Sequence, residues 1–296
     1  MSATGRTLRL AVDVGGTFTD VTLFDPATGS LLSAKTTTTP QNRALGVLDG
    51  IHAALQAADA NAGRVAEVVH GSTTGTNALI ERTGARVGLL TTQGFRDVLE
   101  IGRIMRPDAG LYDFSVDLPL PLVPRHLRLE VPERLDAQGK VLLALDEKAV
   151  IDAARIFERE GVEAVAVCFL FAFLDPRHEE AAERILARHL PGVPISLSSR
   201  VCPEIREYER SSTTVINAYL TPVMSTYLDS LQERLQESLG AVRLSVIQAN
   251  GGATSIAAAR RKSVTTVNSG PAGGVVAAAF YGRRNGRDRL VSVDMG

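Results

Sequence analysis

The residues best suited to chemistry form one short stretch near the start of the chain, Asp13-Val14-Gly15-Gly16-Thr17-Phe18-Thr19-Asp20. Two adjacent glycines let the backbone approach a ligand closely, and their N–H groups can form an anion-binding concavity. Asp13 and Asp20 offer hard oxygen ligands suited to Mg²⁺, and the two threonines offer hydroxyls. The stretch therefore suggests a phosphate-binding loop. An acidic hairpin turn without a ligand is the alternative.

Alternating apolar residues flank this stretch. Leu8, Leu10 and Val12 precede it, and Val21 and Leu23 resume the alternation after it. The pattern predicts two β-strands joined by a tight Gly-Gly turn.

Strand and helix patterns then alternate along the chain. Their alternation predicts an α/β fold with a mixed sheet. We expect strands at 31–35, 65–69, 87–91, 164–171, 195–198, 244–249 and 290–293, and helices at 40–55, 78–82, 146–160, 175–190, 215–239, 255–262 and 275–280. Pro222 should break or kink the long helix. The proline-rich segment 106–134 is expected to be a long connection.

Composition excludes several functions. The length of 296 residues favours about two domains. The net charge of −1 leaves no electrostatic footprint for nucleic acid. Neither a signal peptide nor an apolar run of membrane-spanning length is visible. We therefore expect a cytoplasmic protein that binds neither nucleic acid nor membranes.

Other polar residues could line a cleft. His70, Thr73, Thr74 and Asn77 follow a predicted strand, where α/β folds bind ligands, although they could equally cap the next helix.

Two further groups of candidates lie later in the chain. Glu209 and Arg210 could be acid–base or substrate-orienting groups, or a salt-bridged helix start. The glycines between Gly270 and Gly274 could present N–H groups to an anion, or permit close helix packing.

The end of the chain repeats the opening element. The segment 290–296 reads LVSVDMG, an apolar strand followed by Asp, an apolar residue and Gly, as at 8–15. The repeat suggests two lobes that each supply a phosphate loop. Walker A, GxGxxG and HExxH motifs are missing from the sequence, so any metal should be Mg²⁺ rather than structural zinc.

Taken together, the motifs resemble those of the hydantoinase A/5-oxoprolinase family, within the actin-like ATPase superfamily. The similar stretches are DVGGTFTD at 13–20, HGSTTGTNALIER at 70–82, EIREYERSSTTVINAYLTP at 204–222, QANGG at 248–252 and NSGPAGGVVAA at 268–278. The resemblance implies two ribonuclease-H-like lobes, the first carrying an α/β insertion, with ATP and Mg²⁺ between them. It divides the chain into an N-terminal domain at 1–200 and the start of a hydantoinase A domain at 201–296.

The resemblance also implies roles for particular residues. Asp13 would bind Mg²⁺, with Asp20 as a second metal candidate, and Asp294 would be the matching acid of the second loop. The expected nucleotide-binding residues are Gly15, Gly16, Thr17, Thr19, Gly270, Gly273 and Gly296. Asp13, Asp294 and Glu209 are the expected catalytic residues, and His70, Thr73, Thr74, Asn77 and Arg210 the expected substrate residues.

Such enzymes use ATP to activate a cyclic amide by phosphorylation before its ring is opened, usually with a hydantoinase B-like partner subunit in an oligomer. Similar subunits belong to ketone carboxylases, which is the second enzyme hypothesis. The sequence stops inside the second phosphate motif, so we expect a truncated product with an incomplete second lobe. A third hypothesis follows, that of a catalytically incompetent fragment that binds phosphate or a partner.

Overall fold

The computed structural model describes residues 5–38, 43–103, 115 and 119–293. The chain forms two compact units. Unit 1 combines Met1–Arg82 with Val223–Gly296, and unit 2 is Thr83–Pro222, inserted between the two segments of unit 1. These units are defined by the contacts within each of them. The expected division into domains at residue 200 rests on the family motifs in the sequence and stays a prediction.

Unit 1 contains a six-stranded mixed sheet in the order β12-β11-β4-β1-β2-β3. Its strands are β1 (Leu8–Val14), β2 (Phe18–Asp25), β3 (Ser30–Thr37), β4 (Val65–Ser72), β11 (Arg243–Ile247) and β12 (Ala253–Ser255). The neighbours β1, β4 and β11 run parallel, and the other pairs are antiparallel. The predicted opening hairpin and the mixed sheet are confirmed.

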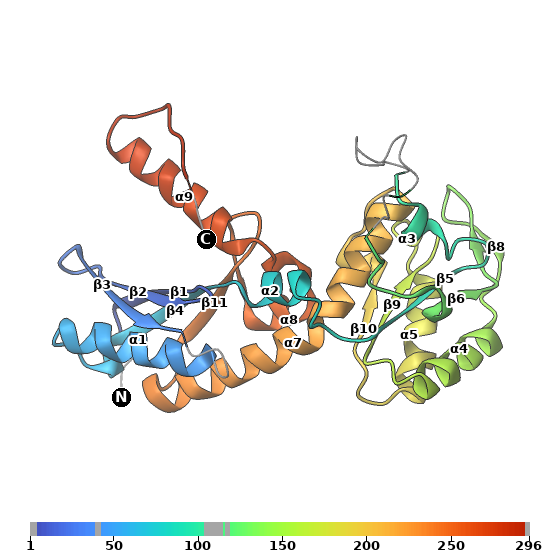
Figure 1. Cartoon of the computed structure of the whole chain (residues 1–296), viewed down its shortest axis with the longest axis horizontal. Helices are drawn as coiled ribbons and strands as arrows, with labels where there is room; N and C mark the ends of the chain where they lie inside the picture. Colours follow the sequence, from blue (N-terminus) through green and yellow to red (C-terminus); the bar gives the residue numbers. More distant parts are fainter. Residues whose placement is uncertain (1–4, 39–42, 104–114, 116–118, 294–296) are drawn as a thin grey trace. The chain divides into compact units, whose positions relative to one another are not determined.

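The helices of unit 1 lie on both faces of this sheet (Figure 1). They are α1 (Arg43–Ala57), α2 (Thr74–Ile80), the later part of α7 (Glu207–Leu239), α8 (Ile256–Arg261) and α9 (Ser269–Arg284), with 3₁₀ turns at Ala62–Arg64 and Ser263–Thr266. The core lies between one face of the sheet and α1 and α7. Residues of β1 alternate between buried and exposed, so Val12 and Val14 enter this core while Asp13 lies on the opposite face.

Unit 2 has its own four-stranded parallel sheet in the order β10-β9-β5-β6. Its strands are β5 (Val87–Thr92), β6 (Arg128–Val131), β9 (Ala164–Cys168) and β10 (Ile195–Leu197), and β7 (Arg134–Leu135) and β8 (Val141–Leu143) form a separate hairpin. The helices are α3 (Val98–Ile101), α4 (Glu147–Arg159), α5 (Arg177–His189), α6 (Ser198–Val201) and the first part of α7, with a 3₁₀ turn at Arg125–Leu127. All five residues of β9 are buried, because helices cover both faces of a parallel sheet.

Local sequence signals explain several element ends. Asp146 caps α4 by accepting a 3.0 Å hydrogen bond from the Ala149 N–H, and Ser255 caps α8 in the same way. Both caps match the predicted helix starts. The predicted start of α1 at Thr39-Pro40 lies outside the described residues.

Other local predictions were wrong. The helix does not break at Pro222: α7 runs from Glu207 to Leu239 through the proline, with the buried side chains of Leu220 and Met224 on either side of it, while a kink there stays a prediction. The helix after β4 begins at Thr74 rather than Ala78, since the Ser72 hydroxyl accepts the Thr74 N–H at 3.1 Å.

Three further differences concern pairing and packing. The helical spacing of Leu45, Ile51 and Leu55 predicts that they share one buried face, but Leu45 is exposed while Ile51 and Leu55 are buried. Gly50 lets α1 lie close to the sheet, since a Cβ added there would lie 2.7 Å from the Val21 side chain. Residues 290–293 form no strand, since no strand of the described residues pairs with them. The expected connection 106–134 includes β6, which pairs with β5.

Within the described part of the chain, no helix has both the length and the apolar character needed to cross a membrane.

Candidate functional site

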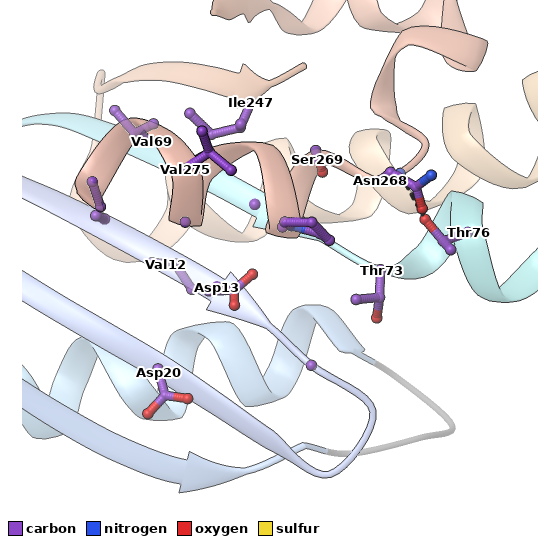
Figure 2. Close-up of a pocket in the computed structure, with 18 of the residues that line it drawn as sticks. Val12, Asp13, Asp20, Val69, Thr73, Thr76, Ile247, Asn268, Ser269 and Val275 are labelled. Carbon is purple, nitrogen blue, oxygen red and sulfur yellow. Dashed lines mark hydrogen bonds between the residues drawn. The ribbon is translucent and has the colours of Figure 1, made fainter. Parts of the chain in front are cut away.

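A pocket of about 1070 Å³ lies in unit 1, on the face of the sheet opposite α1 and α7 (Figure 2). The Gly-Gly turn, the ends of β1 and β4 and the first turns of α2 and α9 line one part of it. Val69, Ile247 and Val275 form an apolar part between the sheet and α9. Segments far apart in the sequence therefore converge on one cavity.

Asp13 occupies a place that the neighbouring strand leaves open for its carboxylate. On β4 the residue paired with Asp13 is Gly71, and on β2 it is Asp20. A Cβ added at Gly71 would lie only 3.0 Å from Asp13 Oδ1, so the glycine provides the space that the carboxylate fills.

Backbone hydrogen bonds fix the Gly-Gly turn. The Gly15 N–H donates to the Phe18 carbonyl at 2.9 Å, and the Gly15 carbonyl accepts the Thr38 hydroxyl at 3.0 Å. Gly16 borders open space, because a Cβ there would meet no atom within 4 Å. Both glycines line the pocket, so a ligand can approach this backbone.

The first turns of α2 and α9 are held together beside the turn. The Asn268 N–H donates to Thr76 Oγ1 at 3.0 Å, and Figure 2 shows these two residues side by side. The Ser269 hydroxyl donates to the Ser72 carbonyl at 3.3 Å. The Thr73 hydroxyl donates to the Val14 carbonyl at 3.2 Å. The start of α9, whose N–H groups favour negative charge, therefore borders the same pocket as Asp13.

The glycines in the first turns of α9 have open space beside them. A Cβ at Gly270, Gly273 or Gly274 would meet no atom within 4 Å in the described structure. Packing among the described residues therefore does not require these glycines, and both roles given for them, binding an anion and packing between lobes, stay predictions.

Eight of the predicted site residues line this pocket. They are Asp13, Gly15, Gly16, Asp20, Thr73, Asn77, Gly270 and Gly273. Sequence reasoning missed other lining residues, namely Gly71, Thr76, Asn268 and Ser269. The alternation of β4 could have identified Gly71, whereas the meeting of Thr76 with Asn268 depends on contacts between distant segments.

Two predicted residues point to the other face of the sheet. Thr19 is fully buried, and its hydroxyl lies 3.2 Å from that of Thr38. His70 is fully buried as well, with Nε2 at 2.7 Å from the Tyr227 hydroxyl on α7. Because strand residues alternate between faces, any effect of these two side chains on a ligand in the pocket would be indirect.

Burial lowers the pKa of His70 from 6.5 to about 4. The imidazole is therefore neutral at pH 7 and adds no charge to the core beside β1.

Two more predicted residues do not line the pocket. The hydroxyl of Thr74, which is buried, bonds that of Ser72 at 2.7 Å, and Thr17 lies exposed in the turn. Asp294 and Gly296 lie outside the described residues.

Glu209 and Arg210 belong to unit 2. Arg210 is fully buried, and its guanidinium donates to the carbonyls of Phe169 at 2.8 Å and Glu204 at 3.2 Å. Glu209 accepts a 2.6 Å hydrogen bond from Arg103. A hydrogen bond from its own backbone, together with that from Arg103, holds the pKa of Glu209 below its usual value. These hydrogen bonds fix the first turn of α7 to neighbouring segments of unit 2. The catalytic role predicted for Glu209 and the substrate role predicted for Arg210 stay predictions.

A second polar cluster, which sequence reasoning missed, is buried in unit 2. Glu133 accepts a hydrogen bond from the Thr92 hydroxyl and lies 2.7 Å from His178 Nδ1. Thr92 also accepts the Leu170 N–H at 3.0 Å. The cluster joins β5 to the segments that follow β6 and β9, which indicates a structural role.

The charges of the unit 1 pocket limit what it can hold. Of the described residues that line it, two carry carboxylates and none is Lys or Arg. The described residues contain no group of three or more His, Cys, Asp or Glu side chains placed to hold a metal. One or two carboxylates fit Mg²⁺, which usually completes its shell with water and substrate phosphates.

The fold and the sequence place the chain among known proteins. Residues 9–190 match the hydantoinase/oxoprolinase N-terminal region and residues 210–296 match hydantoinase/oxoprolinase. The chain belongs to the hydantoinase/oxoprolinase family. The strand order of unit 1, with two antiparallel hairpin connections followed by parallel strands, agrees with the actin-like ATPase fold.

Several relatives have named activities. The caprolactamase subunit alpha of Pseudomonas jessenii is 38% identical over 97% of this chain, and 5-oxoprolinase 1 of Arabidopsis thaliana is 30% identical over 98%. The crystal structure of the ATP-dependent caprolactamase superposes with a TM-score of 0.85 at 36% identity, covering 97% of this chain and 42% of that one. Nucleotide-free acetone carboxylase gives 0.86 at 26% identity, covering 95% and 41%. The chain spans 42% of the caprolactamase subunit and 25% of the oxoprolinase.

Proposed function

We propose that unit 1 binds ATP with Mg²⁺ and that the chain forms part of an enzyme subunit that uses ATP to open a cyclic amide. The observation that carries this proposal is the pocket in which Asp13, the Gly-Gly turn and the start of α9 converge. Relatives named caprolactamase and 5-oxoprolinase support the reaction class.

The residues of the pocket suit separate tasks. Asp13 would hold Mg²⁺, directly or through water, because it offers hard oxygens in a space kept open by Gly71. The backbone N–H groups of Gly16 and of the start of α9 would face phosphate oxygens, whereas the Gly15 N–H fixes the turn by donating to the Phe18 carbonyl. The predicted Asp294 and Gly296 would complete the site from the second loop.

The chemistry explains the need for ATP. An amide is a poor electrophile, and phosphorylation of its oxygen makes the carbon more electrophilic and creates a leaving group. The chain's contribution would be to hold the phosphates and their cation in place, so that charge developing during transfer is stabilised. Thr73 and Asn77, which line the same pocket as Asp13, are the substrate-side candidates.

Two alternatives remain as proposals. The TM-score of 0.86 with acetone carboxylase favours a ketone carboxylase subunit as the second enzyme hypothesis. In both cases a hydantoinase B-like partner would complete the enzyme, in keeping with relatives that are named as subunits. The third proposal is a module that binds phosphate or a partner without turnover.

Calorimetry and a substrate screen separate these proposals. ATP–Mg²⁺ would be titrated into this chain and into a polypeptide as long as the relatives. ATP hydrolysis by the long polypeptide, with and without a B-type partner, would then be measured with lactams, hydantoin, 5-oxoproline and ketones. Stimulation by a cyclic amide is expected. Stimulation by ketones alone would favour the carboxylase, and binding without any stimulation would favour the module.

Asp13→Asn provides the sharpest test of the metal site. The substitution keeps the size of the side chain but removes its charge, so we expect Mg²⁺-dependent nucleotide binding to fall by at least about tenfold. The exposed Asp49 on α1 supplies the matched control, Asp49→Asn, which should bind like the wild type. Thermal unfolding would show that both variants fold. Unchanged binding by Asp13→Asn would remove Asp13 from the site.

A further inference from the structure

Four residues form a row across neighbouring strands at the pocket. Gly71 on β4 pairs with Asp13 on β1, Asp13 pairs with Asp20 on β2, and Asp20 pairs with Lys35 on β3. Residues that pair directly across strands share a face of the sheet, so all four lie on the pocket face. Lys35 is the cationic member of this row.

The Lys35 side chain reaches the rim of the pocket. Its Nζ lies 3.2 Å from Asp20 Oδ1 and 3.3 Å from Asp20 Oδ2, and Asp20 lines the pocket. It also stands 4.9 Å from the centre of the Phe18 ring, beside the Gly-Gly turn. The ammonium group is thus held by a carboxylate and an aromatic face at the edge of the cavity.

The charges that line the pocket suggest a role for Lys35 in binding a negatively charged ligand. Among the described lining residues the pocket has two carboxylates and no cationic side chain, yet phosphate groups carry negative charge at neutral pH. In the row of paired residues that crosses the pocket face, the ammonium group of Lys35 is the positive charge. The Lys35 and Asp20 side chains are 57% and 55% exposed, so parting them costs little and requires no burial of charge.

We propose that Lys35 is a phosphate-binding residue, which exchanges the carboxylate of Asp20 for a phosphate oxygen when a nucleotide enters the pocket. This inference rests on the proposed nucleotide site. It assigns Asp20 to holding Lys35 at the rim of the empty pocket, and leaves Asp13 as the metal-binding carboxylate of the row.

The competing explanation is an ordinary cross-strand ion pair on the surface. Such a pair would affect stability slightly and nucleotide affinity not at all. A matched pair exists in unit 2, where the exposed Lys148 Nζ lies 2.8 Å from Asp152 Oδ2. Lys148→Ala therefore controls for the loss of an exposed lysine and of its ion pair.

The test is calorimetric binding of ATP–Mg²⁺ to the wild type, Lys35→Ala, Lys35→Arg, Asp20→Asn and Lys148→Ala, with thermal unfolding of each. We expect Lys35→Ala to weaken binding by about tenfold to a hundredfold, as for the loss of a hydrogen bond to a charged group. Lys35→Arg, which keeps the charge, should stay within about threefold of the wild type. Asp20→Asn should bind at least as tightly as the wild type, because Lys35 is then released.

Each contrary result has its own meaning. Wild-type affinity in Lys35→Ala would overturn the assignment of Lys35 while leaving the nucleotide site intact. Weaker Mg²⁺-dependent binding in Asp20→Asn would make Asp20 a metal ligand and overturn the exchange. Absence of ATP–Mg²⁺ binding by the wild type, both as this chain and as a polypeptide as long as the relatives, would overturn the proposed function, and the role of Lys35 with it.

Discussion

At the scale of single residues, the site depends on a carboxylate and on the glycine opposite it. Asp13 stood out in the sequence because two glycines and a second acid follow it. Gly71 did not, because its importance comes from the strand beside it. The 3.0 Å between a built Cβ at Gly71 and Asp13 Oδ1 shows that the two positions are matched.

Gly71→Ala tests this match. The added methyl group must displace the Asp13 carboxylate or the strand by a few tenths of an ångström. We expect ATP–Mg²⁺ affinity to fall by about tenfold, since misplaced ligands lose much of a metal's binding energy. Gly5→Ala, at a glycine of the same unit with no atom within 4 Å of its built Cβ, is the control. Equal affinities of the two variants in calorimetry would contradict the match.

His70 predicts a dependence of stability on pH. Its pKa is about 4 in the folded chain and 6.5 without burial, so the unfolded chain binds the proton preferentially between these values. The free energy of unfolding should therefore fall as the pH falls from about 6.5 to 4, by about 3 kcal/mol from this residue.

Denaturant unfolding between pH 7.5 and 4 measures this effect. His70→Gln should lose less stability over that range than the wild type, because glutamine does not titrate. His52→Gln, at the exposed histidine of α1, is the control for replacing a histidine by glutamine. If the pH dependence of His70→Gln equals that of the wild type, burial does not hold His70 neutral.

At the scale of elements, α7 shows how packing overrides a local signal. Pro222 cannot donate a hydrogen bond to the carbonyl of Ala218, yet the helix continues from Glu207 to Leu239. Ala218, Leu220 and Met224 are almost fully buried, so tertiary contacts hold the helix on both sides of the proline.

Pro222→Ala should restore the missing backbone hydrogen bond. We expect the free energy of unfolding to rise by about 1 to 3 kcal/mol, the range of a proline's cost within a helix. Pro176→Ala, at the residue that precedes α5, should leave stability unchanged or slightly lower. Denaturant unfolding compares the two. Destabilisation by Pro222→Ala would mean that the helix is shaped around the proline.

At the scale of the whole molecule, the chain comprises two units with separate sheets, and all described residues that line the proposed nucleotide pocket belong to unit 1. The predicted residues Glu209 and Arg210 lie in unit 2, where carbonyls and Arg103 hold them.

Hydrogen exchange tests which of the two units binds the ligand. ATP–Mg²⁺ should slow amide exchange at Gly16, Ser269 and Gly270, which line the pocket. Amides of β5 and β9 in unit 2 should exchange as in the free protein. Protection confined to the start of α7 around Arg210 would instead support the substrate role predicted for that residue and contradict the proposed pocket.

The sequence by itself determined the opening hairpin, the α/β class, the caps at Asp146 and Ser255 and the chemical character of Asp13 to Gly16. These features depend on neighbours along the chain: a period of two residues, a turn or a cap. Family motifs added the expectation of a nucleotide site.

Tertiary structure alone decided which candidates meet. The pairing of β1 with β4 places Gly71 against Asp13, and the position of α9 brings Asn268 to Thr76. The tertiary structure also buries Thr19 and His70 in the core and pairs Lys35 on β3 with Asp20 on β2. These outcomes depend on contacts between segments far apart in the sequence, whose free energy no local pattern encodes.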